Sequence, residues 1–180
     1  MSRQFINRGL QIYDLFVHNY RVSAQVDTRH RTMNDLLNDR MTSYLELFDS
    51  YVSRVDQPGR IVAHYPQAML RKDGVSFVIV PEDQSRPSGQ RAYSYIGRSR
   101  YEVFLALPFF EVKGEMFMAG KLNLHHFLVK ESEQFFPIGT GTAVLTLASD
   151  ITFEGEAFLM NKERTEFFGV TEPPSMSTRL

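Results

Sequence analysis

Histidine is the residue type in this chain best suited to metal or proton chemistry, because the 180 residues include no cysteine. The lack of cysteine excludes thiolate zinc sites, cysteine nucleophiles and a disulfide framework. Five histidines are present, at positions 18, 30, 64, 125 and 126. Neighbours on a helix point about 100° apart, so His125 and His126 do not converge on one ion. A site there would need a third ligand such as Glu131 or Glu133, and we expect no metal and no cofactor.

Motifs for nucleophilic catalysis and for phosphate binding are missing from the sequence. There is no GxSxG, no GxxxxGK[ST], and no GxGxxG between a strand and a helix. The segment IGTGTAV (138–144) contains two glycines but is flanked by strand-forming residues. Acidic residues are plentiful, yet no pair stands out by its spacing. The lack of these motifs favours a non-enzymatic protein. An enzyme would have to use a pocket between two parts of the chain.

The segment RPSGQRAYSYIGRSR (86–100) interleaves basic and aromatic side chains. Arginines can bind phosphates while tyrosine rings stack on bases, so this segment is a candidate for binding a ligand or partner. Its candidate residues are Arg86, Arg91, Tyr93, Tyr95, Arg98 and Arg100. The alternative is a plain linker, since proline, serine and glycine at 87–89 favour turns and flexibility. The arginines could also lie against the acidic second half of the chain.

Charge is distributed unevenly around a net value of −1. Residues 1–83 carry ten basic and ten acidic groups, and residues 84–100 carry four arginines and no acid. Residues 101–180 carry six basic and eleven acidic groups. This separation permits head-to-tail contact between copies of the chain. We therefore expect a protein partner or self-association, with nucleic acid as the second choice.

The elements that would position these side chains are indicated by a sequence pattern that occurs twice in the chain. YDLFV (13–17) matches YEVFL (101–105), and after two extra residues in the second copy YRV (20–22) matches FEV (110–112). TMNDLLND (32–39) then falls on NLHHFLVK (123–130), and YLELF (44–48) on FFPIG (135–139). AML (68–70) meets AFL (157–159), and FVIVPE (77–82) meets FFGVTE (167–172). Matched apolar spacing over this length indicates a tandem duplication.

Each copy has the pattern of a curled antiparallel sheet with one short helix. Residues 10–17 and 22–26 have strand character, and His18-Asn19 suits a hairpin turn. Thr32 and Asn123 are candidate helix N-caps. The predicted class is α+β, mainly antiparallel β. We expect two small, barrel-like units packed as a pseudo-twofold pair over an apolar interface, with phenylalanines 109, 110, 117, 135 and 136 in the second core.

These patterns set the expected boundaries along the chain. Residues 1–8 form an N-terminal extension, 9–83 the first repeat, 84–100 the Arg/Tyr linker, 101–172 the second repeat, and 173–180 a disordered tail. No apolar stretch approaches the length of a membrane span or a signal peptide, so we expect a cytoplasmic protein without membrane contact.

Several phrases resemble a small bacterial domain family of unknown function. VKGEMFM, LHHFLV, QFFPIGTGTAV and AFLMNKERTEFF carry the resemblance in the second half, and MNDLLND and YLELFDSYV in the first. The first half has AMLRKDG where the family shows an AVNK cue, and His126 replaces the aspartate of its helix start. The resemblance covers about two-thirds of the chain and implies a fold without an activity.

The sequence as a whole predicts a non-enzymatic interaction or scaffold protein built from a duplicated β-module and able to self-associate. The alternative is a regulatory module that binds a nucleotide or nucleic acid through residues 86–100.

Overall fold

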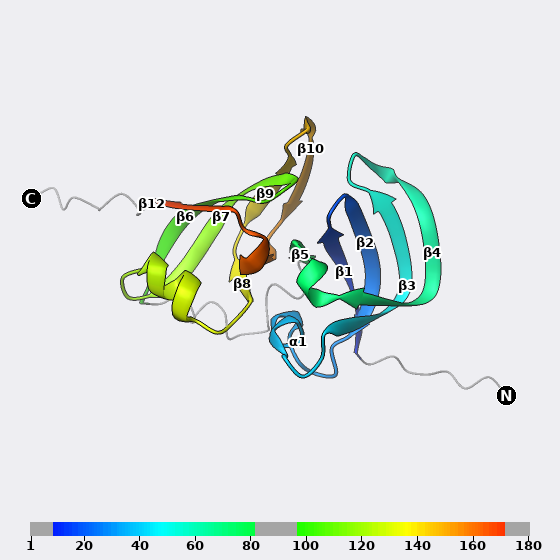
Figure 1. Ribbon diagram of the computed structural model, residues 1–180, viewed down its shortest axis with the longest axis horizontal. Helices are drawn as coiled ribbons and strands as arrows, with labels where there is room; N and C mark the ends of the chain where they lie inside the picture. The colour runs from blue at the N-terminus through cyan, green and yellow to red at the C-terminus, as the bar shows by residue number, and fades with distance from the viewer. Residues whose placement is uncertain (1–8, 82–96, 172–180) are drawn as a thin grey trace, which may run out of the picture.

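The computed structural model describes residues 9–81 and 97–171, which form two antiparallel sheets with a few short helical segments (Figure 1). This confirms the predicted class, mainly antiparallel β. The first sheet has seven strands in the order β4-β3-β2-β1-β5-β11-β8, and the second has five in the order β10-β9-β7-β6-β12. Neither sheet closes on itself in the described residues, so the expected barrel-like closure is not seen.

The first half of the chain forms a long meander around one short helix. Its elements are β1 (Leu10–Val17), β2 (Tyr20–Asp27), α1 (Met33–Asn38), β3 (Tyr44–Arg54), β4 (Gln57–Arg71), the 3₁₀ turn η1 (Lys72–Gly74) and β5 (Phe77–Val80). The predicted hairpin turn is confirmed, with His18 at a φ of +49° between β1 and β2. Val22, Ala24 and Val26 are buried and their neighbours on β2 are not, as the alternation predicts.

The second half forms a similar series of elements with two more strands. Its elements are β6 (Arg98–Ala106), β7 (Phe110–Ala119), the π-helical turn η2 (His126–Lys130), β8 (Phe135–Ile138), β9 (Gly141–Leu145), β10 (Ala148–Gly155), β11 (Ala157–Asn161), the 3₁₀ turn η3 (Lys162–Arg164) and β12 (Phe167–Thr171). β8 and β9 stand where the first half has the continuous β3, and β10 and β11 where it has β4. The residues Arg98 to Arg100, expected in the linker, open strand β6.

The hairpins of the two halves correct one detail of the sequence comparison. Val17 pairs with Tyr20 in the first half, and Leu107 and Phe110 exchange two backbone hydrogen bonds in the second. The two hairpins have the same loop length, so the two extra residues expected in the second copy do not exist. If the two hairpins are superposed by their pairing, residues 90 apart occupy the same place, and Tyr101 falls on Gln11 instead of Tyr13. The sequence comparison matched residues that lie on the same face of the strand but two positions apart, because side-chain direction in a strand repeats every two residues.

The sequence match between the C-terminal part of β4 and β11 is also displaced, here by one residue. Tyr44 lies opposite Arg71, and Phe135 lies opposite Asn161. The pairing therefore sets Ala68 over Phe158, one residue away from the match found in the sequence.

The two halves are joined by strand pairing and by shared cores. β5 of the first half pairs with β11 of the second, which carries β11 and β8 into the first sheet. A twofold relation would also pair β12 with β4, but within the described residues β12 pairs only with β6. The expected packing of the halves as a pseudo-twofold pair is therefore not confirmed.

The predicted aromatic core is divided between the halves. Phe110 and Phe136 are buried in the second core, and Phe109 packs against it. Phe117 is half-buried. Phe135 is fully buried among residues of the first half, since β8 lies in the first sheet.

Candidate functional site

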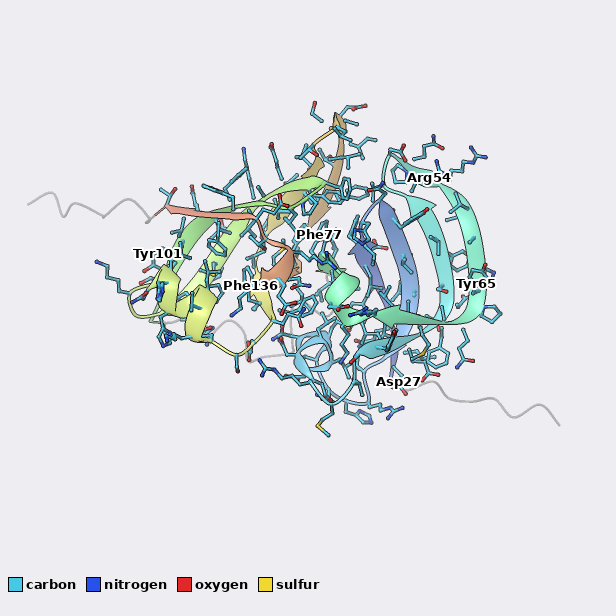
Figure 2. All side chains as sticks on the ribbon, in the orientation of Figure 1. Asp27, Arg54, Tyr65, Phe77, Tyr101 and Phe136 are labelled. Carbon is cyan, nitrogen blue, oxygen red and sulfur yellow. The ribbon has the colours of Figure 1, made fainter. Side chains whose placement is uncertain are left out.

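Aromatic rings fill the junction between the halves. The rings of Phe16 and Phe77 stack with centroids 4.3 Å apart, and both are fully buried. Phe110 contacts them edge-on from the second half, 5.1 Å from Phe77, and Phe153 lies 4.8 Å from Phe16. Figure 2 shows Phe77 in the middle of the molecule, between the two sheets. The halves are therefore one packed body at this point.

A polar cleft of about 490 Å³ opens beside this junction. The segments that line it are 37–43 with 71–73 from the first half, and 128–134 with 162–163 from the second. Its ionisable lining residues include Asp39, Lys72, Glu131 and Lys162. This is the place where an enzyme's polar groups would converge, so the partners of each group decide what the cleft can do.

The two lysines of the cleft hold corresponding positions, 90 residues apart, and make corresponding contacts. Lys72 donates from Nζ to the carbonyl of Asp39 (2.9 Å) and to Thr42 Oγ1 (2.8 Å), just after α1. Lys162 donates to the carbonyls of Phe127 (3.0 Å) and Glu131 (3.4 Å) around η2. A cation at the C-terminal end of a helical turn is favourable because the free carbonyls there carry partial negative charge.

Burial lowers the pKa of both lysines from the ordinary value. Desolvation disfavours the ammonium form, and the nearby carboxylates of Asp39 and Glu131 oppose this effect. Lysines with a lowered pKa can serve as bases, but here each Nζ is already bonded to two oxygens of its own half. We infer that the two lysines have a structural role and hold the ends of the helical turns in place.

Other groups of the cleft tie one half to the other. Asn38 donates from Nδ2 to the carbonyl of Phe135 (2.9 Å) and accepts from its N–H (2.8 Å). Arg40 donates to the carbonyl of Ser132. These bonds satisfy backbone groups at the start of β8, and they make the cleft a seam between the halves.

The predicted binding segment is only partly described. Arg86, Arg91, Tyr93 and Tyr95 lie outside the described residues. Arg98 is exposed at the start of β6. Arg100 is bonded to Glu115 of β7 at 2.8 Å, so it lies against an acid of the second half, as one of the readings of the sequence expected.

All five histidines are exposed, and one of them, His64, forms a pair with an acid that the sequence did not indicate. His125 and His126 are exposed, and His126 Nδ1 lies 4.0 Å from Glu131 Oε1. His64 bonds Asp49 through Nε2 at 2.7 Å and stacks on Tyr51 at 4.3 Å. Asp49 has a φ of +46°, at an irregularity in the pairing of β2 with β3. No sequence spacing predicts this pair, because cross-strand pairing brings residues 49 and 64 together. Among the described residues no group of three metal-ligating side chains is found.

Large apolar side chains are exposed on strand β4, at the outer edge of the first sheet. They are Ile61, Val62, Tyr65 and Met69, each about half exposed or more. Ile61 and Val62 are adjacent on one strand, at an irregularity where Ala63 pairs with Val52 and Ile61 with Ser53. Figure 2 shows Tyr65 at the outer margin of the molecule, on β4. An apolar edge of this kind is a typical surface for protein contact.

The second sheet has an open hollow of about 560 Å³ on its outer face. Strands β6, β7, β9 and β12 line it, with Phe104 and Gly169 among the lining residues. Phe104 and the exposed Phe167 meet edge-on with centroids 6.1 Å apart. This hollow and the β4 edge are the candidate interaction surfaces.

Comparison with protein-family models, with curated proteins and with solved structures finds no match to this chain. The resemblance to a bacterial domain family therefore stays a prediction. In the part of the chain that the structure describes, no helix has the length and apolar character of a membrane span.

Proposed function

We propose that this protein is a non-enzymatic interaction or scaffold protein built from two copies of one β-module. The order β4-β3-β2-β1-β5 in the first half has the same connectivity as β10-β9-β7-β6-β12 in the second. A constant shift of 90 residues relates the hairpins, and the same shift relates Lys72 to Lys162. These correspondences support a duplication in which the modules follow one another in a row instead of facing each other across a twofold axis.

The observation that carries the interaction function is the apolar edge of β4. Three of its exposed side chains, Ile61, Val62 and Tyr65, lie within five consecutive residues. Exposed apolar clusters on an edge strand mark contact sites because a partner strand can satisfy the backbone and bury the side chains together. The polar cleft supports an enzyme less well, since its lysines and amides are bonded within the protein.

A photocrosslinking amino acid at position 65 tests this function in cells that produce the protein. We expect covalent adducts of defined mass with a protein at position 65, and none at position 129, where Val129 is exposed on η2. Val62→Asp should remove the adducts because it places a charge on the apolar edge. The same adducts at both positions, or none at either, would refute a docking function for β4.

The nucleotide or nucleic-acid alternative stays a prediction, because four of its six residues lie outside the described part of the chain. The ion pair of Arg100 with Glu115 does not favour it.

A further inference from the structure

The junction inside the chain uses one edge of each half and leaves one edge of each half without a strand partner among residues 9–81 and 97–171. β5 pairs with β11. Within the described residues β12, the counterpart of β5, pairs only with β6, and β4, which includes the counterpart of β11, pairs only with β3. Figure 1 places β12 and β4 at opposite ends of the molecule. The two ends thus carry the same kinds of edge that are joined in the middle.

We propose that copies of this protein associate head to tail, with β12 of one copy pairing antiparallel to residues 67–70 of β4 in the next. This deepens the proposed function and rests on it, since the register comes from shifting the internal junction by 90 residues. Met160 lies opposite Phe77 in that junction. The shift sets Leu70 opposite Phe167 of the neighbouring copy.

Exposure at the two free edges fits this pairing. Phe77 is fully buried at the internal junction, whereas its counterpart Phe167 is 58% exposed. Met69, on the free edge of β4, is 61% exposed. Pairing the edges would bury both side chains, which is the main favourable contribution to association.

The hollow on the second sheet is the counterpart of a surface that is covered in the first half. The outer face of β1 and β5 carries Phe16 and Phe77, which lie beneath rings of the second half. The outer face of β6 and β12 carries Phe104, which lines the open hollow, and Phe167, whose ring meets that of Phe104 edge-on. A second copy placed by the same junction would cover it with its own first half.

Side-chain sizes at the two junctions compensate each other. Inside the chain, Gly155 lies against Ile79, and a Cβ on the glycine would stand 2.7 Å from Ile79 Cγ2. The shift replaces this pair by Tyr65 and Gly169 of the neighbouring copy. A small residue thus faces a large one in both cases, with the sizes exchanged, and the exposed Tyr65 gains a place to pack.

The paired stretches lack the usual protection against pairing, although Pro66 and Arg71 flank the stretch on β4, and the flanks are complementary in charge. Residues 67–70 and 167–170 contain no charged residue and no proline. The backbone N–H of Asn161 bonds the carbonyl of Ser76 at 3.1 Å beside the internal junction. The shift places Arg71 and Glu166 at the corresponding points, so a cation faces an anion between copies.

Association of this kind is heterologous, because β12 and β4 are different surfaces at opposite ends. Each added copy leaves one edge of each kind free. The products are rings, where the rotation closes, or filaments.

Light scattering of the full chain at low ionic strength tests the proposal. We expect the wild-type mass to rise with concentration above the 20.8 kDa of one chain. Phe167→Asp should block the β12 end and Met69→Asp the β4 end, so each variant alone should remain a monomer. Their equimolar mixture should give a dimer of one chain of each and nothing larger, because one intact edge of each kind is left.

Two controls separate the edges from general effects. Val129→Asp changes a side chain that is 62% exposed, much like Met69, and should associate like the wild type. Glu166→Arg and Arg71→Glu should each weaken association, and mixing the two variants should restore contact between the new arginine and the new glutamate. Circular dichroism should show every variant folded.

A wild type that stays at the mass of one chain at every concentration overturns the proposal. So does a mixture of the folded Phe167→Asp and Met69→Asp variants that forms no dimer. Position-specific crosslinks from residue 65 to a different protein would then leave the interaction function standing without self-association.

Discussion

Thr32 and Asp35 hold the start of α1 through a reciprocal pair of hydrogen bonds. The N–H of Asp35 donates to Thr32 Oγ1 at 3.1 Å, and the N–H of Thr32 donates to Asp35 Oδ2 at 3.0 Å. The hydrogen bonds from Thr32 lower the pKa of Asp35. At the C-terminal end of α1, hydrogen bonds from Arg31 and Met41 lower the pKa of Asp39. Short helices need such bonds because few intrahelical bonds form.

We expect these two acids to make stability depend on pH under acidic conditions. A carboxyl group whose pKa is lowered on folding stabilises the folded state above its unfolded pKa, about 3.9 for aspartate, and loses this contribution as the pH falls through the lower, folded value. Asp35→Asn should cost about 0.5 kcal/mol at neutral pH. The substitution should also reduce the decrease in unfolding free energy as the pH falls below the unfolded pKa of aspartate.

Urea unfolding measured from neutral to strongly acidic pH checks this prediction. Asp56→Asn, at the exposed turn between β3 and β4, is the control. An unchanged acid profile for Asp35→Asn would contradict it.

Among the elements, β8 is the strand whose position the sequence did not predict. It belongs to the second half by sequence but pairs with β11 at the far edge of the first sheet. Phe135 at its start is fully buried among Tyr13, Leu37 and other residues of the first core. Asn38 of α1 binds its backbone from the same side. β8 thus connects α1 of the first half to the strands of the second half.

Phe135→Ala should therefore destabilise the whole protein by about 3–5 kcal/mol, through lost burial and a cavity in the first core. The unfolding transition should stay single, since the ring belongs to both halves. Thermal and urea unfolding measure this, with Leu147→Ala, a change of a side chain that is 87% exposed, as the control. A normal melting temperature would show that the ring is not held where the structure places it.

The elements themselves were predictable and their alignment was not. The alternation of Val22, Ala24 and Val26 gave a strand with one buried face, and Thr32 gave the helix start. The match of Tyr13 with Tyr101 was displaced by two residues, because residues i and i+2 of a strand occupy the same face and look alike in sequence. Only the backbone pairing of the hairpins fixed the register.

At the scale of the molecule, the halves depend on each other for their cores. The second half covers Phe16 and Phe77 and also supplies Phe135 and Leu159 to the first core. A fragment of residues 9–81 would expose these apolar surfaces and the full edge of β5. We expect fragments 9–81 and 97–171 to be insoluble or unfolded separately and to recover strand content when refolded together.

Circular dichroism and gel filtration of the separate and combined fragments measure this. Two cooperative, stable fragments would contradict a shared core, although they would leave the duplication intact.

The features of the candidate site also divide into those that the local sequence indicates and those that depend on contacts between distant segments. The arginines of residues 86–100 were visible as composition, yet the shorter of the two ion pairs of Arg100, with Glu115 at 2.8 Å, depends on β6 lying beside β7. The apolar edge of β4 gave no local signal, because its exposure results from the lack of a strand beside it in the described residues.

The sequence alone determined the strand character of residues 10–17 and 22–26, the apolar face of β2, and where α1 begins, since these follow from spacing and from contacts within a few residues. The tertiary structure decided that β5 pairs with β11, that β12 and β4 do not pair with each other in the described part of the chain, and that Phe135 packs in the core of the other half. The physical reason is that a strand's side-chain period fixes its faces but not its neighbours. The choice of neighbour depends on backbone pairing and burial between distant segments.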